Sequence, residues 1–76
     1  MSRTSTYHAL SGYIHRDTDK AIHFEVIEID GVPVEDQKKE WFPLSQCSKI
    51  TRQAKGSQEM DKIEVSAWIL STKGYI

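Results

Sequence analysis

Residues 20–30 read KAIHFEVIEID, and this stretch decides the fold. Up to Val26 every second residue is apolar, which is the pattern of a β-strand with one buried face. After Val26 the phase changes, because Ile27 and Ile29 then carry the apolar positions. A regular strand cannot change phase, since a shift of one residue moves every side chain to the other face. The pattern therefore predicts a long central strand with a β-bulge at Val26–Ile27, and such a bulge bends a strand strongly.

The segments on either side also have strand and turn patterns. Residues 7–15 (YHALSGYIH) predict a strand with both faces partly apolar, in which Gly12 marks a bulge or the close approach of another backbone. Residues 16–19 (RDTD) predict the turn that joins the two strands. Asp30-Gly31 predicts a second tight turn, and residues 34–40 (VEDQKKE) an exposed loop tip or a short edge.

The second half of the chain is more interrupted. Residues 40–44 (EWFPL) predict a third strand that is cut short by its proline. Residues 45–50 (SQCSKI) are interpreted as one helical turn, capped by Ser45. Residues 51–60 are polar and predict a loop, and residues 61–65 (DKIEV) predict the last strand.

A short helix is expected after this last strand. Ser66 suits the N-cap position, Lys73 the last turn and Gly74 the C′ position. The predicted fold is therefore mainly β with one short C-terminal helix. Its four or five antiparallel strands would form a small curved sheet or a barrel of the SH3 or OB kind, with the helix plugging one end.

The aromatic pair in the third strand sets a question about the core. Adjacent residues of a strand point to opposite faces, so Trp41 and Phe42 cannot both enter one core. We expect Trp41 to be the core anchor. Phe42 then either packs under the helix or is exposed beside a basic loop, where it would be the first place to look for a partner. The predicted core consists of Ile22, Phe24, Trp41, Ile63, Val65 and Trp68.

Length and composition bound the class of protein. With 76 residues the chain is expected to form one small β-barrel-like domain over residues 7–76, preceded by a flexible N-terminal arm over residues 1–6. The single cysteine, Cys47, excludes an intrachain disulfide and fits a reducing compartment. No signal-peptide or membrane-span pattern occurs, so we expect a soluble, cytoplasmic protein without membrane contact.

No arrangement of residues predicts catalysis. His15 and His23 flank the 16–19 turn and are expected to face each other across it, but no third metal ligand has a useful spacing. Cys47 has no neighbouring histidine, and no glycine-rich phosphate loop is present. We therefore expect a protein that is not an enzyme and has no metal or cofactor.

Charge is segregated along the chain, although the net charge is only −1. Five acidic and no basic residues lie between Glu25 and Asp36, and three basic and no acidic residues lie between Leu44 and Ser57. The basic residues follow one another at a spacing of three, which would place them on one side of a helical turn. Both regions are either plain solvated surface or contact a partner. The candidate partner-binding residues are Tyr13, Glu25, Glu28, Phe42, Lys49, Arg52 and Lys55.

Three motifs occur in a familiar order: TDKAI (18–22), WFPLSQ (41–46) and IEVSAWILSTKG (63–74). This order resembles small proteins of bacteriophages and mobile elements with a T-[DE]-K-A-[IV] strand start, a W-[IFL]-P-x-S-Q strand end and a final W-L-x-x-K-G helix. The resemblance covers residues 13–74, and the loops at 30–40 and 51–60 depart from it. It implies a compact single domain without known catalytic residues, and it carries no assigned biochemical activity.

The sequence thus leads to two functional expectations. The first is a non-enzymatic interaction module, a phage-encoded inhibitor or accessory protein of the anti-CRISPR-like class that binds a host or defence protein. The alternative is a small barrel that binds single-stranded nucleic acid through the basic 49–55 loop and exposed tyrosines. The protein is expected to be a monomer, or a homodimer that pairs edge strands.

Overall fold

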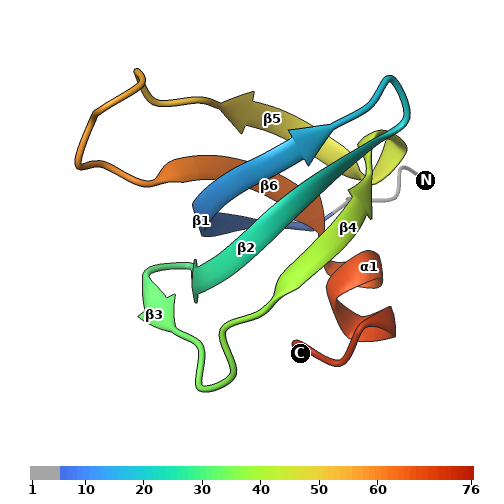
Figure 1. Ribbon diagram of the computed structural model, residues 1–76. Coiled ribbons are helices and arrows are strands. Elements are labelled where there is room, and N and C mark those ends of the chain that lie inside the picture. The colour runs from blue at the N-terminus through green and yellow to red at the C-terminus, as the bar shows by residue number, and fades with distance from the viewer. Residues whose placement is uncertain (1–5) are drawn as a thin grey trace.

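The computed structural model describes residues 6–76 as one antiparallel sheet of six strands followed by a short helix (Figure 1). Of the arm expected over residues 1–6, only Thr6 belongs to the described residues. The elements are β1 (Tyr7–Asp17), β2 (Ala21–Ile29), β3 (Val32–Pro33), β4 (Lys39–Pro43), the 3₁₀ helix η1 (Leu44–Gln46), β5 (Cys47–Thr51), β6 (Asp61–Ser66) and α1 (Ala67–Thr72). The prediction of a mainly β fold with one C-terminal helix is confirmed.

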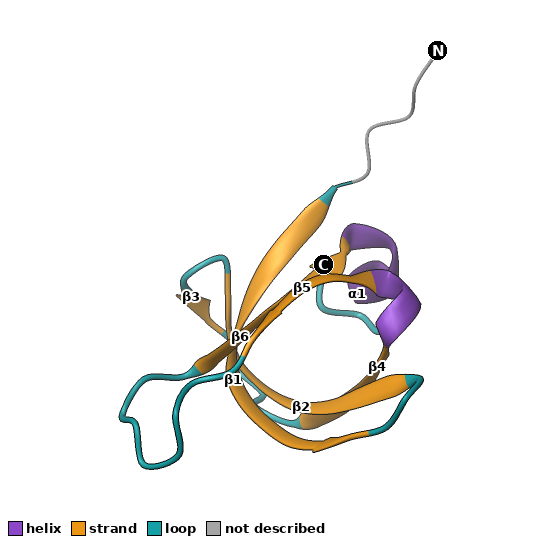
Figure 2. Cartoon of the chain, turned by 90° about the horizontal axis from the view of Figure 1, so that it is seen from above, coloured by secondary structure: helices purple, strands orange, loops and turns teal. Residues whose placement is uncertain are grey.

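The sheet has the order β3-β2-β1-β6-β5, and β4 pairs with β2 on the same side as β3. Viewed from above, the strands curl around a common centre (Figure 2). β4 and β5 are joined by η1 but do not pair with each other, so this curved sheet is open rather than a closed barrel.

The predicted bulge in β2 is confirmed, and a bulge of this kind bends a strand. Ser11 pairs with Glu28 and Gly12 pairs with Val26, which leaves Ile27 without an opposite residue. Gly12 lies against the backbone of β2, because a Cβ atom at this position would be 1.8 Å from the carbonyl oxygen of Glu25. A second bulge, which the sequence did not predict, falls at residue 15 of β1.

The predicted Asp30-Gly31 turn is also confirmed, with positive φ values of 52° and 82° at its two residues. The Asp30 carboxylate fixes the turn to β1, since it accepts the backbone N–H of Ala9 at 3.0 Å and lies 2.6 Å from Nδ1 of His8. These two hydrogen bonds hold the pKa of Asp30 below its ordinary value.

The core contains nine fully or nearly buried hydrophobic residues: Leu10, Ile22, Phe24, Val26, Phe42, Ile63, Val65, Ile69 and Leu70. Four predicted core residues are therefore confirmed: Ile22, Phe24, Ile63 and Val65. The predictions for the two tryptophans are wrong, because Trp41 is 43% exposed and Trp68 is 64% exposed. Phe42 occupies the core position expected for Trp41, and Ile69 and Leu70 occupy the one expected for Trp68.

The physical reason for the exchange at Trp41 is the pairing of β4 with β2. Phe42 is opposite the buried Ile22, so it shares the inner face, and Trp41 is opposite His23 on the outer face. At Trp68 the reason is the N-cap. The Ser66 hydroxyl accepts the N–H of Ile69, and the helix begins at Ala67. A helix that begins at this residue has Ile69 and Leu70 on its buried side and Trp68 on its exposed side.

The helical turn expected over residues 45–50 is mostly a strand. Only Leu44–Gln46 forms a 3₁₀ turn, and Cys47–Thr51 pairs with β6 as β5. The interpretation that places Lys49, Arg52 and Lys55 on one side of a helical turn is therefore wrong. Lys49 lies in β5, whereas Arg52 and Lys55 lie in the loop that follows it.

Candidate functional site

Three strands place a group of ring-bearing side chains on the outer face of the sheet. The buried residues of β2 alternate with His23 and Glu25, which therefore point away from the core. Trp41 of β4 is in register with His23, and Tyr13 of β1 is in register with Glu25. We call the group of Tyr13, His15, His23, Glu25 and Trp41 the outer aromatic face.

The rings of this face are ordered by contacts with one another. The indole of Trp41 stacks on the imidazole of His23, with ring centroids 4.6 Å apart and ring planes 13° from parallel. The rings of His15 and His23 are 6.2 Å apart, which confirms that these histidines face each other. Nε2 of His15 lies 2.8 Å from Oε1 of Glu25, so a carboxylate is held in the middle of the face.

The Trp41 ring has little conformational freedom, because neighbouring strands fix its backbone and the stack on His23 restricts its rotamer. Trp41 and Tyr13 nevertheless remain exposed, at 43% and 46%. An exposed but preorganised aromatic surface of this kind can be covered by a partner at a small entropic cost.

The structure separates the remaining candidate residues from this face. Phe42 is buried in the core and has no exposed surface with which to bind a partner. Lys49 is in β5, at the far end of the strand order, and is in register with Glu64 of β6. Arg52 binds the Asp17 carboxylate, and Lys55 is exposed in the 52–60 loop. Glu28 lies beyond the Ile27 bulge, opposite Ser11 and Pro33.

Sequence reasoning found Tyr13, Glu25 and the two facing histidines but placed Trp41 in the core. The available signal was that Trp41 and Phe42 have opposite faces, and this signal does not say which of them is inside. Only the register between β4 and β2 decides the choice, and it depends on contacts between residues far apart in the sequence.

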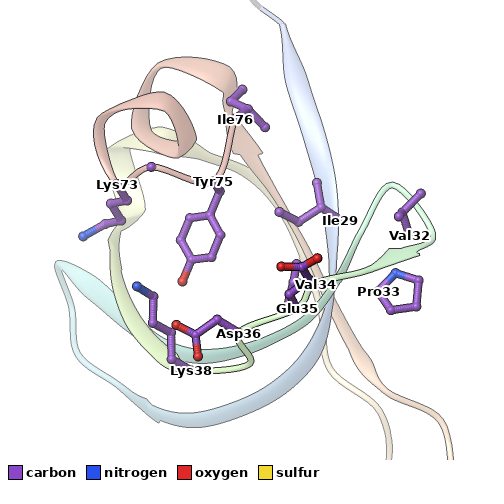
Figure 3. A pocket seen from close by; sticks show the side chains of 11 residues that line it. Ile29, Val32, Pro33, Val34, Glu35, Asp36, Lys38, Lys73, Tyr75 and Ile76 are labelled. Carbon is purple, nitrogen blue, oxygen red and sulfur yellow. The ribbon is translucent and has the colours of Figure 1, made fainter.

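A pocket of about 480 Å³ lies between the β2–β4 connection and the end of the chain (Figure 3). The Tyr75 side chain points from the C-terminal segment into the space enclosed by the curved sheet, toward Asp36 and Lys38. The Lys38 ammonium is 5.7 Å from the centre of that ring, and Lys73 lies 3.6 Å from the Glu40 carboxylate. Burial and the negative charge of Glu40 raise the pKa of the Tyr75 phenol. These contacts tie the chain end to the sheet, which is a structural role.

Among residues 6–76 no group of three or more His, Cys, Asp or Glu side chains is arranged to hold a metal ion. No helix in this part of the chain is long and apolar enough to cross a membrane.

Comparisons with protein-family models, with curated proteins and with solved structures gave no match.

Proposed function

We propose that this protein is a non-enzymatic interaction module that binds a partner protein through its outer aromatic face. The observation that carries the proposal is the exposed indole of Trp41, held flat against His23 on two paired strands. Tryptophan and tyrosine are enriched among the residues that dominate binding energy at protein interfaces. Covering the exposed part of Trp41, about 100 Å², would contribute about 2.5 kcal/mol to binding.

The distribution of charge favours a protein partner over a nucleic acid. Glu25 lies in the middle of the outer aromatic face and would repel phosphates. Of the candidate basic residues, Lys49 is in β5 and Arg52 is paired with Asp17, so both lie away from this face. Arg16 and Lys39 are in register with His23 and Glu25, so the face carries charges of both signs, which suits a protein surface better than a polyanion. The net charge of −1 adds no general attraction for a polyanion.

The expected identity of the partner, a host or defence protein bound by a phage-encoded inhibitor, is supported by the motif resemblance of residues 18–22, 41–46 and 63–74. The cytoplasm of a bacterial cell is accordingly the compartment in which we propose that it acts.

Affinity capture from a bacterial lysate tests the proposal. Immobilised wild-type protein is compared with Trp41→Ala, and Trp68→Ala is the matched control because it removes an exposed tryptophan from α1 instead. The expected result is a set of captured proteins that survives nuclease treatment, is kept by the control and is lost by Trp41→Ala. Equal capture by all three baits would contradict the proposal.

The stacked Trp41–His23 pair also gives a specific reason to test single-stranded nucleic acid, because a flat aromatic platform can stack a base. A fluorescent single-stranded oligonucleotide is titrated at low salt. Binding that is lost in Trp41→Ala and weakens with salt would show that the outer aromatic face binds a nucleic acid instead of a protein. Absence of binding removes this second function.

A further inference from the structure

β5 is an edge strand with a free side. It pairs with β6 and with no other strand among the described residues, and Figure 1 shows it at one margin of the sheet. Its residues from Ser48 to Thr51 are all exposed. An edge of this kind presents backbone N–H and C=O groups that can form a ladder with another chain.

One side chain of β5 shows that the inner face is incomplete at this edge. Ile50 is in register with Ile63, which is 1% exposed, so both residues belong to the core side of the sheet. Ile50 itself is 38% exposed, since no strand follows β5 in the sheet. A strand added to β5 would cover this isoleucine, which supplies an apolar contribution besides the backbone hydrogen bonds.

The charge around this edge is basic. Lys49 lies in the middle of β5, and Arg52 and Lys55 follow it without an acidic residue between them. Lys49 and Lys62 also line a small depression of about 110 Å³ next to the edge. Glu64 lies in the same depression, where it accepts a hydrogen bond from the hydroxyl of Ser48. Because Arg52 is already paired with Asp17, the lysines Lys49, Lys55 and Lys62 provide the positive charge near this carboxylate.

The position of Lys49 argues against a second copy of the chain as the occupant. β5 has five residues, and Lys49 is the central one. In a symmetric antiparallel pair of two β5 strands that is centred on this residue, and so pairs the full length of the strand, Lys49 of one copy would lie opposite Lys49 of the other. Like charges directly opposite each other destabilise a strand pair, whereas an acidic residue at this place would stabilise it.

We propose that β5 accepts an extended, acidic segment of a partner protein as an added strand. The added strand would pair with the free side of β5, cover Ile50, and place a carboxylate near Lys49. This inference rests on the proposed function only in taking the partner to be a protein, and it concerns a surface different from the outer aromatic face.

Binding of short synthetic peptides tests the proposal. The probe is a fluorescent peptide of about eight residues in which Glu alternates with Val, and the comparison peptides carry Lys in place of Glu or N-methylated amides on alternate residues. The full chain is expected to bind the acidic peptide and neither comparison peptide. Amide NMR shifts are expected to concentrate on residues 47–52.

A charge-reversal variant locates the effect. Lys49→Glu is expected to weaken binding of the acidic peptide about tenfold, because it replaces an attraction by a repulsion. Lys20→Glu makes the same change at the exposed β1–β2 turn and is expected to bind like the wild type. Equal effects of the two variants, or NMR shifts away from β5, would overturn the proposal.

Two other outcomes would also overturn it. One is a dimer of the wild-type chain that buries β5, detected by light scattering and by intermolecular contacts of Ile50. The other is binding of a single-stranded oligonucleotide at β5 in preference to the peptide. Capture that depends on Trp41 would stand in either case, so failure of this inference is distinct from failure of the proposed function.

Discussion

Gly12 lies where β1 passes closest to β2, and its missing side chain allows the two backbones to meet. A Cβ atom there would be 1.8 Å from the carbonyl oxygen of Glu25, so Gly12→Ala must displace a strand. We expect this substitution to cost about 3 kcal/mol of the free energy of unfolding. The measurement is urea unfolding followed by circular dichroism.

Gly56→Ala is the control for this prediction. Gly56 has a φ of 86° but open space around a Cβ atom, so only backbone strain of about 1 kcal/mol is expected. If Gly12→Ala were no more destabilising than Gly56→Ala, the close approach of the two strands would be wrong.

The adjacent rings of β4 are expected to respond to truncation in opposite ways. Phe42→Ala removes a fully buried ring and should cost about 3–5 kcal/mol. Trp41→Ala removes an exposed ring and should cost about 1 kcal/mol, mainly through the lost stack on His23. The unfolding free energies of the two variants test this order. A larger loss in Trp41→Ala would show that Trp41 is the buried residue of the pair.

Asp30 links the stability of the turn to pH. Hydrogen bonds from His8 and from the Ala9 amide lower its pKa below 3.8, so the ionised form is favoured in the folded state. A lowered pKa contributes stability above the unfolded pKa, and this contribution is lost as pH falls through the folded pKa. We expect wild type to lose more stability than Asp30→Asn when the pH falls below about 4.

Asparagine is the suitable replacement because it tolerates the positive φ of 52° at this position. Thermal unfolding of both proteins from pH 7 downward gives the comparison. The variant should be the less stable protein at neutral pH, and the difference should shrink in acid. A constant difference across this range would mean that the charge of Asp30 contributes nothing.

At the scale of elements, patterns within one segment were predictable and pairings between distant segments were not. The change of phase at Val26 predicted the bulge at Ile27, because the apolar residues before and after it show which face of the strand is buried. The sequence did not predict the bulge at residue 15. The residues that follow Ile14 in β1 are polar, so they do not show which face of the strand is buried.

β5 shows the same limit more strongly. Residues 47–51 have little apolar periodicity, and Ser45, which suits an N-cap position, favoured a helical turn over residues 45–50. The strand conformation comes from pairing with β6, where Ile50 meets Ile63. Tertiary contacts of this kind override weak local preferences. The same holds for the candidate binding surfaces. The exposure of Trp41 and the free edge of β5 both depend on strand pairing, so the local sequence could not predict them.

The helix α1 is short and depends on its N-cap. The Ser66 hydroxyl accepts the N–H of Ile69 at 3.3 Å and donates to Oε1 of Gln46 at 2.6 Å, so it joins the helix to η1. Ser66→Ala is expected to cost about 1–2 kcal/mol. Ser71→Ala, at an exposed position of the same helix, is the control and should change stability little. Equal costs for the two variants would show that the cap is unimportant.

At the scale of the whole molecule, the open sheet has two different margins, with β3 and β4 at one and β5 at the other. β4 is tied to the C-terminal segment, because Lys73 lies 3.6 Å from Glu40 and 5.9 Å from the ring centre of Phe42. Among residues 6–76 no segment covers the free side of β5 in a comparable way, and Lys49 is exposed in this strand. Lysine on an edge strand is a common means of preventing unwanted strand pairing.

This arrangement predicts how the chain associates with itself. Wild type is expected to remain a monomer, because two β5 strands paired over their full length would bring Lys49 opposite Lys49. Lys49→Val removes the repulsion and favours the strand conformation, so it should dimerise or aggregate at concentrations where wild type does not. Light scattering after size exclusion is the measurement, and Lys20→Val at the β1–β2 turn is the control. If both variants remained monomeric, the charge on β5 would not be what keeps two copies apart, and the shape of the edge would have to prevent pairing.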